Sequence, residues 1–152
     1  MIYRIYTQFM EHDRSGQISL LIGAVADDGV PTDSLLDCLK IDKNFAARVQ
    51  TLYVSIINAR PLPLEIVRPL SKEQNLSIKE LKKAKIRLAF FVDVEFYLSD
   101  SVPKKAIVFL LRFPKKDKKT TENAIKKAQA IRDEFLELKL QKKINTEVID
   151  NA

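Results

Sequence analysis

Cationic side chains are the residues of this sequence whose types and spacing could do chemistry. Lysine and arginine bind phosphate groups, and one arginine can hold two phosphate oxygens at once. Five cations lie near the ends of three strand-like segments in the second half of the chain: Lys82, Arg87, Arg112, Lys115 and Lys116. If the fold brings these ends together, the five residues predict a site for a phosphate-bearing ligand.

The net positive charge of the chain is concentrated in one stretch. The 152 residues carry a net charge of +6, whereas residues 104–143 alone hold 13 basic and five acidic residues, a net charge of +8. Concentrated positive charge favours a polyanionic partner, because neutralised phosphates release their condensed counterions. A lysine-rich, solvated helix face would give the same pattern. Charge alone therefore leaves nucleic-acid binding and this simpler interpretation equally open.

Composition excludes several other kinds of site. A chain of this length fits one domain, and 46% hydrophobic residues are enough to fill its core. The single cysteine, Cys38, excludes an intrachain disulfide and a site of several thiolates. We interpret Cys38 as a buried small hydrophobe and His12 as a surface residue, and we expect no metal and no cofactor. Neither a glycine-rich phosphate loop nor an apolar stretch of membrane-spanning length is found, so we expect a cytoplasmic protein that contacts no membrane.

Hydrophobic patterns predict the elements that position the candidate residues. Alternating or continuous apolar runs indicate strands, and apolar residues at helical spacing behind a capping residue indicate helices. The predicted strands cover residues 2–9, 17–25, 78–82, 85–98 and 106–113. The predicted helices are capped by Thr32 or Asp33, by Asp42, and by Thr120 or Thr121, and they end near residues 39, 58 and 143.

These elements predict a single α+β domain over residues 1–143. About forty N-terminal residues, 1–40, form an extension that we expect to add a strand pair beside the sheet. The continuous apolar run at 106–113 is typical of a central strand covered on both faces. Residues 144–152 are expected to be a frayed tail.

The longest predicted strand sets the direction of Arg87. Apolar residues alternate along it from Ile86 to Phe96 and should share one face of the sheet, so Arg87 points to the other face. The simpler interpretation of Arg87 is a salt bridge with Glu80 or Glu95. A role in ligand binding is the alternative.

The last three predicted strands form a sequential antiparallel block. Lys82 ends the first strand and Arg87 begins the second, so both fall at one edge of the block. We expect Arg112, near the end of the third strand, at the opposite end of the second strand. A bend or a shorter pairing is then needed to bring Arg112 and Lys115 to the other two cations.

Three blocks of this region resemble one known family. Residues 78–91 resemble the "ELR … yRi.ff" pattern of the RelE/ParE toxin superfamily, especially its HigB-like, phage-derived branch. Residues 109–116 resemble the "lLhgF.KK" pattern of that branch, and residues 120–132 resemble its "ktP..eI..A..R" helix start. The resemblance covers about residues 42–137.

The chain departs from the family pattern at three positions. Lys82 stands where the family usually has arginine, and Thr121 stands where it usually has proline. Leu111 and Arg112 occupy the place where a histidine often occurs.

The resemblance implies a fold and a function. The implied fold is RelE-like: an antiparallel sheet packed against N-terminal helices, with a C-terminal amphipathic helix. The implied protein is the toxin of a type II toxin-antitoxin system, an endoribonuclease that cleaves mRNA on the ribosome. Its partners would be mRNA and a cognate antitoxin protein, with operator DNA bound only through the antitoxin.

The resemblance also implies roles for individual residues. In such an enzyme the RNA 2′-hydroxyl attacks its own phosphate, and cations stabilise the charged transition state. Arg87 and Arg112 would clamp the transition state, Lys115 or Lys116 would align the phosphate, and Lys82 would act as general base. Further RNA contacts are expected from five residues: Lys79, Lys85, Phe113, Lys118 and Lys119.

Two other functions stay open from the sequence. One is a toxin-fold protein without catalysis that binds a protein target, as ParE-type members bind gyrase. The other is an RNA-binding module without cleavage, in which Phe113 or Phe91 stacks on bases.

Overall fold

The computed structural model describes residues 1–9, 18–63, 65–70, 77–98 and 102–150, and every structural statement below refers to these residues. They form seven strands, three α-helices and one short 3-10 helix. In chain order the elements are β1 (Ile2–Tyr6), η1 (Thr7–Phe9), β2 (Leu20–Ala26), α1 (Ser34–Ile41), α2 (Phe45–Ile57), β3 (Val67–Pro69), β4 (Lys79–Lys83), β5 (Ile86–Phe96), β6 (Lys104–Pro114), α3 (Lys118–Leu140) and β7 (Asn145–Ile149).

The strands form one mixed sheet in the order β3-β4-β5-β6-β2-β1-β7. The α+β class is confirmed, and so is the strand pair contributed by the N-terminal forty residues, since β1 and β2 join the sheet beside β6. The prediction of a purely antiparallel sheet is wrong. β2 runs parallel to β6, and β7 runs parallel to β1, while the other neighbours are antiparallel.

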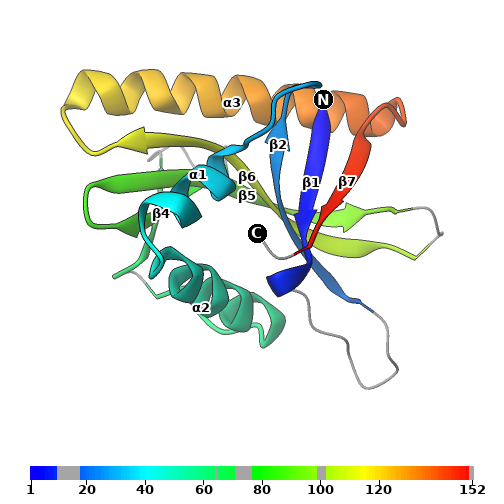
Figure 1. Cartoon of the computed structure of the whole chain (residues 1–152), viewed down its shortest axis with the longest axis horizontal. Helices are drawn as coiled ribbons and strands as arrows, with labels where there is room; N and C mark the ends of the chain where they lie inside the picture. The colour runs from blue at the N-terminus through cyan, green and yellow to red at the C-terminus, as the bar shows by residue number, and fades with distance from the viewer. Residues whose placement is uncertain (10–17, 64, 71–76, 99–101, 151–152) are drawn as a thin grey trace.

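Helices cover both faces of this sheet, with α3 on one side and α1 and α2 on the other (Figure 1). We call these the α3 face and the α1/α2 face. In the α3 face, the Phe135 ring lies 5.8 to 6.0 Å from the rings of Tyr3, Phe91 and Phe96. In the α1/α2 face, helix residues such as Phe45 pack against the strands.

The central position of β6 is confirmed by its side chains. Ile107 and Phe109 are buried in the α1/α2 face, whereas Ala106 and Val108 are buried in the α3 face. A strand buried on both faces requires a continuous apolar sequence, which is what residues 106–113 supply.

The alternation predicted for β5 holds only along its first part. Ile86, Leu88 and Phe90 belong to the α1/α2 face as expected. An irregularity between Asp93 and Phe96 then changes the register, and Phe96 is buried in the α3 face instead. A β-bulge of this kind turns the following side chains to the other side of the sheet.

Aspartates begin two of the helices. Asp33 caps α1, as predicted, and its carboxylate accepts a hydrogen bond from the backbone N–H three residues later at 2.9 Å. α3 is capped by Asp117, which accepts from the Thr120 N–H at 2.7 Å, so the prediction of a threonine cap is wrong. α2 begins at Phe45 with Asn44 at its N-cap, so the prediction that Asp42 caps this helix is wrong; Asp42 lies in the turn before it and accepts from the Asn44 N–H.

The predicted frayed tail is also wrong, because Asn145–Ile149 form β7. This strand pairs with β1 over its whole length, and the two lie side by side in Figure 1. Beyond the ladder, the Thr7 hydroxyl lies 2.6 Å from the Asp150 carboxylate and donates to it. The side chains of Asn145 to Val148 are exposed, so the sequence has no apolar pattern from which this strand could be predicted.

Candidate phosphate-binding site

The β4–β5 hairpin places Lys82 and Arg87 directly opposite each other. They are cross-strand partners, and they share a face of the sheet with Ala89, which is buried against α3. Both cations therefore lie on the α3 face, at the end of the sheet where β5 begins.

Three further charged residues join them. Glu80 pairs with Ala89 and so lies on the same face, and Arg68 of β3 is the cross-strand partner of Glu80. The backbone N–H of Lys115 donates to the Lys85 carbonyl at 2.7 Å, which brings the loop before α3 onto the hairpin turn. We call Arg68, Lys82, Arg87 and Lys115, with Glu80 among them, the cationic cluster.

Arg87 is the buried member of the cluster. Its side chain is 9% exposed, and its Nη1 donates to the Ala84 carbonyl at 2.7 Å and to the Ile86 carbonyl at 2.9 Å. Its Nε lies 3.8 Å from the Glu80 carboxylate, which confirms the predicted ion pair. The guanidinium is held by two carbonyls of its own hairpin and is buried. Arg87 therefore fixes the position of the Glu80 carboxylate and adds positive charge to the cluster without being exposed itself.

The cluster shifts the pKa of two of its members. Burial lowers the pKa of Lys82, and the neighbouring charges of Arg68 and Arg87 lower it further, while Glu80 acts in the opposite direction. Burial raises the pKa of Glu80, against the effect of the surrounding cations. A lysine whose pKa is lowered is closer to its neutral form near pH 7, and only that form can accept a proton.

Arg112 does not belong to the cluster. It is exposed and pairs with Leu88, whose side chain is buried in the α1/α2 face, so Arg112 lies on the opposite side of the sheet from Arg87. The cause is a bulge: Phe109 pairs with Phe90, but Leu111 pairs with Ala89. With no residue inserted at this point, Arg112 would be the direct partner of Arg87.

The expected bend is not needed. Pro114, at the end of β6, pairs with Ile86, at the start of β5, because antiparallel neighbours bring the end of one strand beside the start of the other. The prediction that Arg112 lies at the opposite end of β5 from Arg87 is wrong, because Arg112 pairs with Leu88. Lys115 therefore meets Lys82 and Arg87 through sequential pairing alone.

The other predicted contact residues are scattered over the surface and the core. Lys79 pairs with Phe90 and lies on the α1/α2 face, away from the cluster. Phe113 and Phe91 are only 5% and 2% exposed as residues, so neither ring presents a face for stacking on a base. Exposed cations near the cluster are found in the hairpin turn, in the loop before α3 and in its first turn: Lys85, Lys116, Lys118 and Lys119.

Arg68 is the member of the cluster that the sequence prediction missed. β3 has only three residues, and its position beside β4 depends on a pairing across the 71–76 segment. The one sequence indication was the Arg68–Leu70 stretch, which resembles a "k.L" pattern before the first hairpin of the toxin family.

A cavity of about 530 Å³ adjoins the cluster. Lys115 belongs to both, and Leu70, two residues after Arg68, forms part of its wall. The remaining lining residues come from the loop before α3 and its first turns: Lys116, Asp117, Lys118, Thr121, Glu122 and Ile125.

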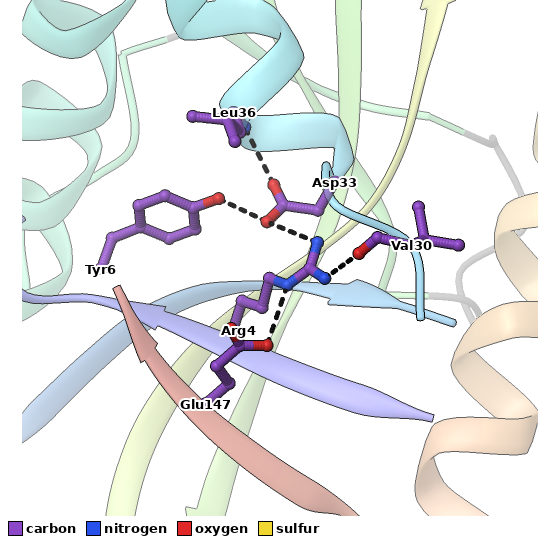
Figure 2. A network of polar contacts seen from close by, with 6 residues as sticks. All are labelled: Arg4, Tyr6, Val30, Asp33, Leu36 and Glu147. Carbon is purple, nitrogen blue, oxygen red and sulfur yellow. Dashed lines mark hydrogen bonds and ion pairs between the residues drawn. The ribbon is translucent and has the colours of Figure 1, made fainter. Parts of the chain in front are cut away.

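A second polar network lies on the α1/α2 face, around the buried side chain of Arg4 (Figure 2). Its Nη2 donates to the Val30 carbonyl, its Nε donates to Glu147 of β7 at 3.3 Å, and its Nη1 lies 3.8 Å from the Asp33 carboxylate. The Tyr6 hydroxyl donates to the same carboxylate. Burial and this hydrogen bond raise the pKa of Tyr6. The network ties β1 to β7 and to the start of α1, which is a structural role.

The remaining candidates for chemistry give no second site. Cys38 is buried, as predicted, and burial raises the pKa of its thiol to about 12. His12 lies outside the described residues. Within the ranges that the structure describes, no three His, Cys, Asp or Glu side chains are grouped so that they could hold a metal ion. Among the helices of those ranges, none is long and apolar enough to cross a membrane.

No protein-family model matches the chain, and no curated protein is significantly similar to it.

Proposed function

We propose that this chain is an endoribonuclease of the RelE-like toxin type, the toxin of a type II toxin-antitoxin system, with the cationic cluster as its active site. The observation that carries the proposal is the gathering of Arg68, Lys82 and Lys115 around the buried Arg87 and its half-buried partner Glu80. Arg68 and Lys115 are exposed and Lys82 is half-buried, so three cations can reach a ligand.

Such a cluster suits cleavage of RNA by its own 2′-hydroxyl. Lys82, in its neutral form, accepts the proton of the 2′-hydroxyl while the oxygen attacks the adjacent phosphorus. The bond to the 5′ oxygen breaks, that oxygen takes a proton from solvent, and a 2′,3′-cyclic phosphate is left. Arg68 and Lys115 stabilise the charge that develops on the phosphate oxygens. In this assignment Arg68 replaces Arg112 as a clamp.

Glu80 and Arg87 hold this arrangement in place. The Arg87 guanidinium is fixed by two carbonyls of the hairpin, so the Glu80 carboxylate beside it has a defined position among the cations. The Arg87 guanidinium also places a positive charge next to Lys82. Both residues act through their neighbours and are positioning residues.

The order of the elements supports the proposal. Two helices precede the antiparallel β4–β5–β6 block, and a long amphipathic helix follows it, as the resemblance to the toxin family implies. The same resemblance is the basis for proposing a cognate antitoxin as partner, mRNA as substrate, and operator DNA bound through the antitoxin. On this proposal the protein acts in the cytoplasm.

Cleavage of mRNA in a translation reaction tests the proposal. The test variant is Arg68→Gln with Lys82→Gln, and we expect it to lose about 100-fold or more in cleavage rate. The matched control is Lys83→Gln with Arg112→Gln, which removes the same charge from the opposite face and should cleave like the wild type. Equal cleavage by all three proteins would place the chemistry elsewhere. Growth arrest with intact mRNA would favour a protein target instead.

A further inference from the structure

The cavity beside the cationic cluster lies on the same face of the sheet as the cluster. Leu70 is buried in the α3 face, the face that also carries Arg68 and Glu80. Lys115 lines the cavity, and its charge acts on Glu80 and on Lys82. A ligand that reaches the cluster is therefore adjacent to the cavity.

The walls of the cavity combine apolar and cationic groups. Leu70 and Ile125 supply an apolar surface, and the exposed residues Lys115 and Lys116 add cationic side chains to the lining. At about 530 Å³ the cavity has room for a nucleobase, and it opens broadly to solvent.

Both acidic residues of the lining already have partners. Asp117 accepts the Thr120 N–H that begins α3, and this hydrogen bond lowers the pKa of its carboxyl. Glu122 lies 4.0 Å from the Lys118 ammonium. The Thr121 hydroxyl donates to the Asp117 carbonyl at 3.2 Å. The lining holds three lysines, Lys115, Lys116 and Lys118, against these two carboxylates, so its formal net charge is +1.

We propose that this cavity is a nucleobase subsite, which takes the base of the nucleotide next to the phosphate held by the cationic cluster. The inference rests on the proposed function, because it needs RNA at the cluster. A flat base with an attached phosphate fits a lining that combines apolar and cationic side chains, whereas binding of phosphates alone would need no cavity. Since a base paired in a duplex cannot enter, the substrate is single-stranded at this nucleotide.

Abasic scanning of a short RNA tests the subsite on the wild-type protein. The probe is a fluorescent uridine oligonucleotide, made uncleavable by 2′-O-methyl groups, in which one base at a time is removed without changing the charge. Fluorescence anisotropy should show binding about 5- to 100-fold weaker when one particular base is missing, the loss usual for a base that packs on a side chain. The other abasic positions should bind like the intact strand. The salt dependence of binding should stay the same in all of them, because no phosphate is removed.

A variant that fills the cavity provides an independent measurement. Thr121→Trp should abolish the difference between the intact and the abasic strand. Asn123→Trp, on the exposed side of the same helix, should preserve it. Circular dichroism of both variants checks that they are folded, and the scan on the wild type needs no variant.

The outcomes separate the two proposals. RNA binding with equal affinity for every abasic strand would overturn the subsite and leave the proposed function standing. If removal of the base weakens binding equally in Thr121→Trp and in the wild type, the base binds outside this cavity, and the subsite is overturned as well. No RNA binding even at low salt would overturn the proposed function, and the subsite with it.

Discussion

Lys82 and Arg87 face each other as direct cross-strand partners in the β4–β5 hairpin, on the side of the sheet where Arg68 and Lys115 also lie. Like charges at directly opposed positions destabilise a strand pair, by about 0.2–1 kcal/mol. Two like charges placed opposite each other reduce stability, and such pairs are expected at sites that bind an oppositely charged ligand.

The first prediction concerns this repulsion. Lys82→Gln should raise the free energy of unfolding by up to about 1 kcal/mol, because it removes the opposed charge, while it lowers RNA cleavage. Urea denaturation and cleavage assays on the same preparation measure the two effects. Lys83→Gln is the control, since Lys83 lies on the other face, 3.8 Å from Asp42, and its loss should cost about 1 kcal/mol or less without affecting cleavage. A Lys82→Gln protein less stable than this control would contradict the prediction.

The second prediction concerns pH. Lys82 serves as base only when neutral, and its pKa lies below the ordinary 10.5, so cleavage of a short RNA should rise with pH and level off below pH 10.5. The Glu80 charge raises the pKa of Lys82, so Glu80→Gln should lower that pKa further and move the rise to lower pH. Single-turnover rates from neutral to alkaline pH give both profiles. Profiles that coincide would remove Lys82 as the base.

The third prediction separates two arginines that look alike in the sequence. Arg87→Gln should destabilise the fold by about 1–3 kcal/mol, because two backbone carbonyls and the Glu80 carboxylate lose a buried partner. Arg112→Gln should change stability by no more than about 0.5 kcal/mol, because Arg112 is exposed. Chemical denaturation of the two variants in parallel checks this. Comparable losses from both would mean that the hydrogen bonds of Arg87 contribute little.

The fourth prediction concerns the Arg4 network. Arg4→Met leaves the Asp33 carboxylate buried without its cation, and removing one partner of a buried ion pair costs about 3–5 kcal/mol. Glu147→Gln should cost about 1 kcal/mol or less, because the Glu147 side chain is 48% exposed. Thermal denaturation of the two variants gives the comparison, and a larger loss for Glu147→Gln would reverse the assigned importance of the two contacts.

Much of the fold is predictable because its signals are local. The apolar run of β6, the Asp33 cap and the burial of Cys38 each depend on neighbouring residues, and the structure confirms all three. β7 could not be predicted in the same way. Its side chains are mostly exposed, and its partner β1 lies at the other end of the sequence.

Which residues of the candidate site lie together depends on the pairing register of the strands, and a single sequence does not specify that register. Lys82 and Arg87 were placed correctly because a tight hairpin sets their pairing. Arg112 was misplaced because one bulged residue between Phe109 and Leu111 turns it to the other face. Arg68 was missed because its strand is short and its pairing with Glu80 is visible only in the folded sheet.

The parallel pairing of β1 with β7 also bears on how the molecule is made. Arg4 of β1 and its partner Glu147 of β7 are 143 residues apart in the sequence. During translation the outer edge of β1 therefore stays open until β7 has emerged as well. Contacts between residues so far apart in sequence slow folding, and an open edge can pair with other chains. We conclude that pairing of β7 with β1 is a late step of folding and that the edge of β1 is open to other chains until then.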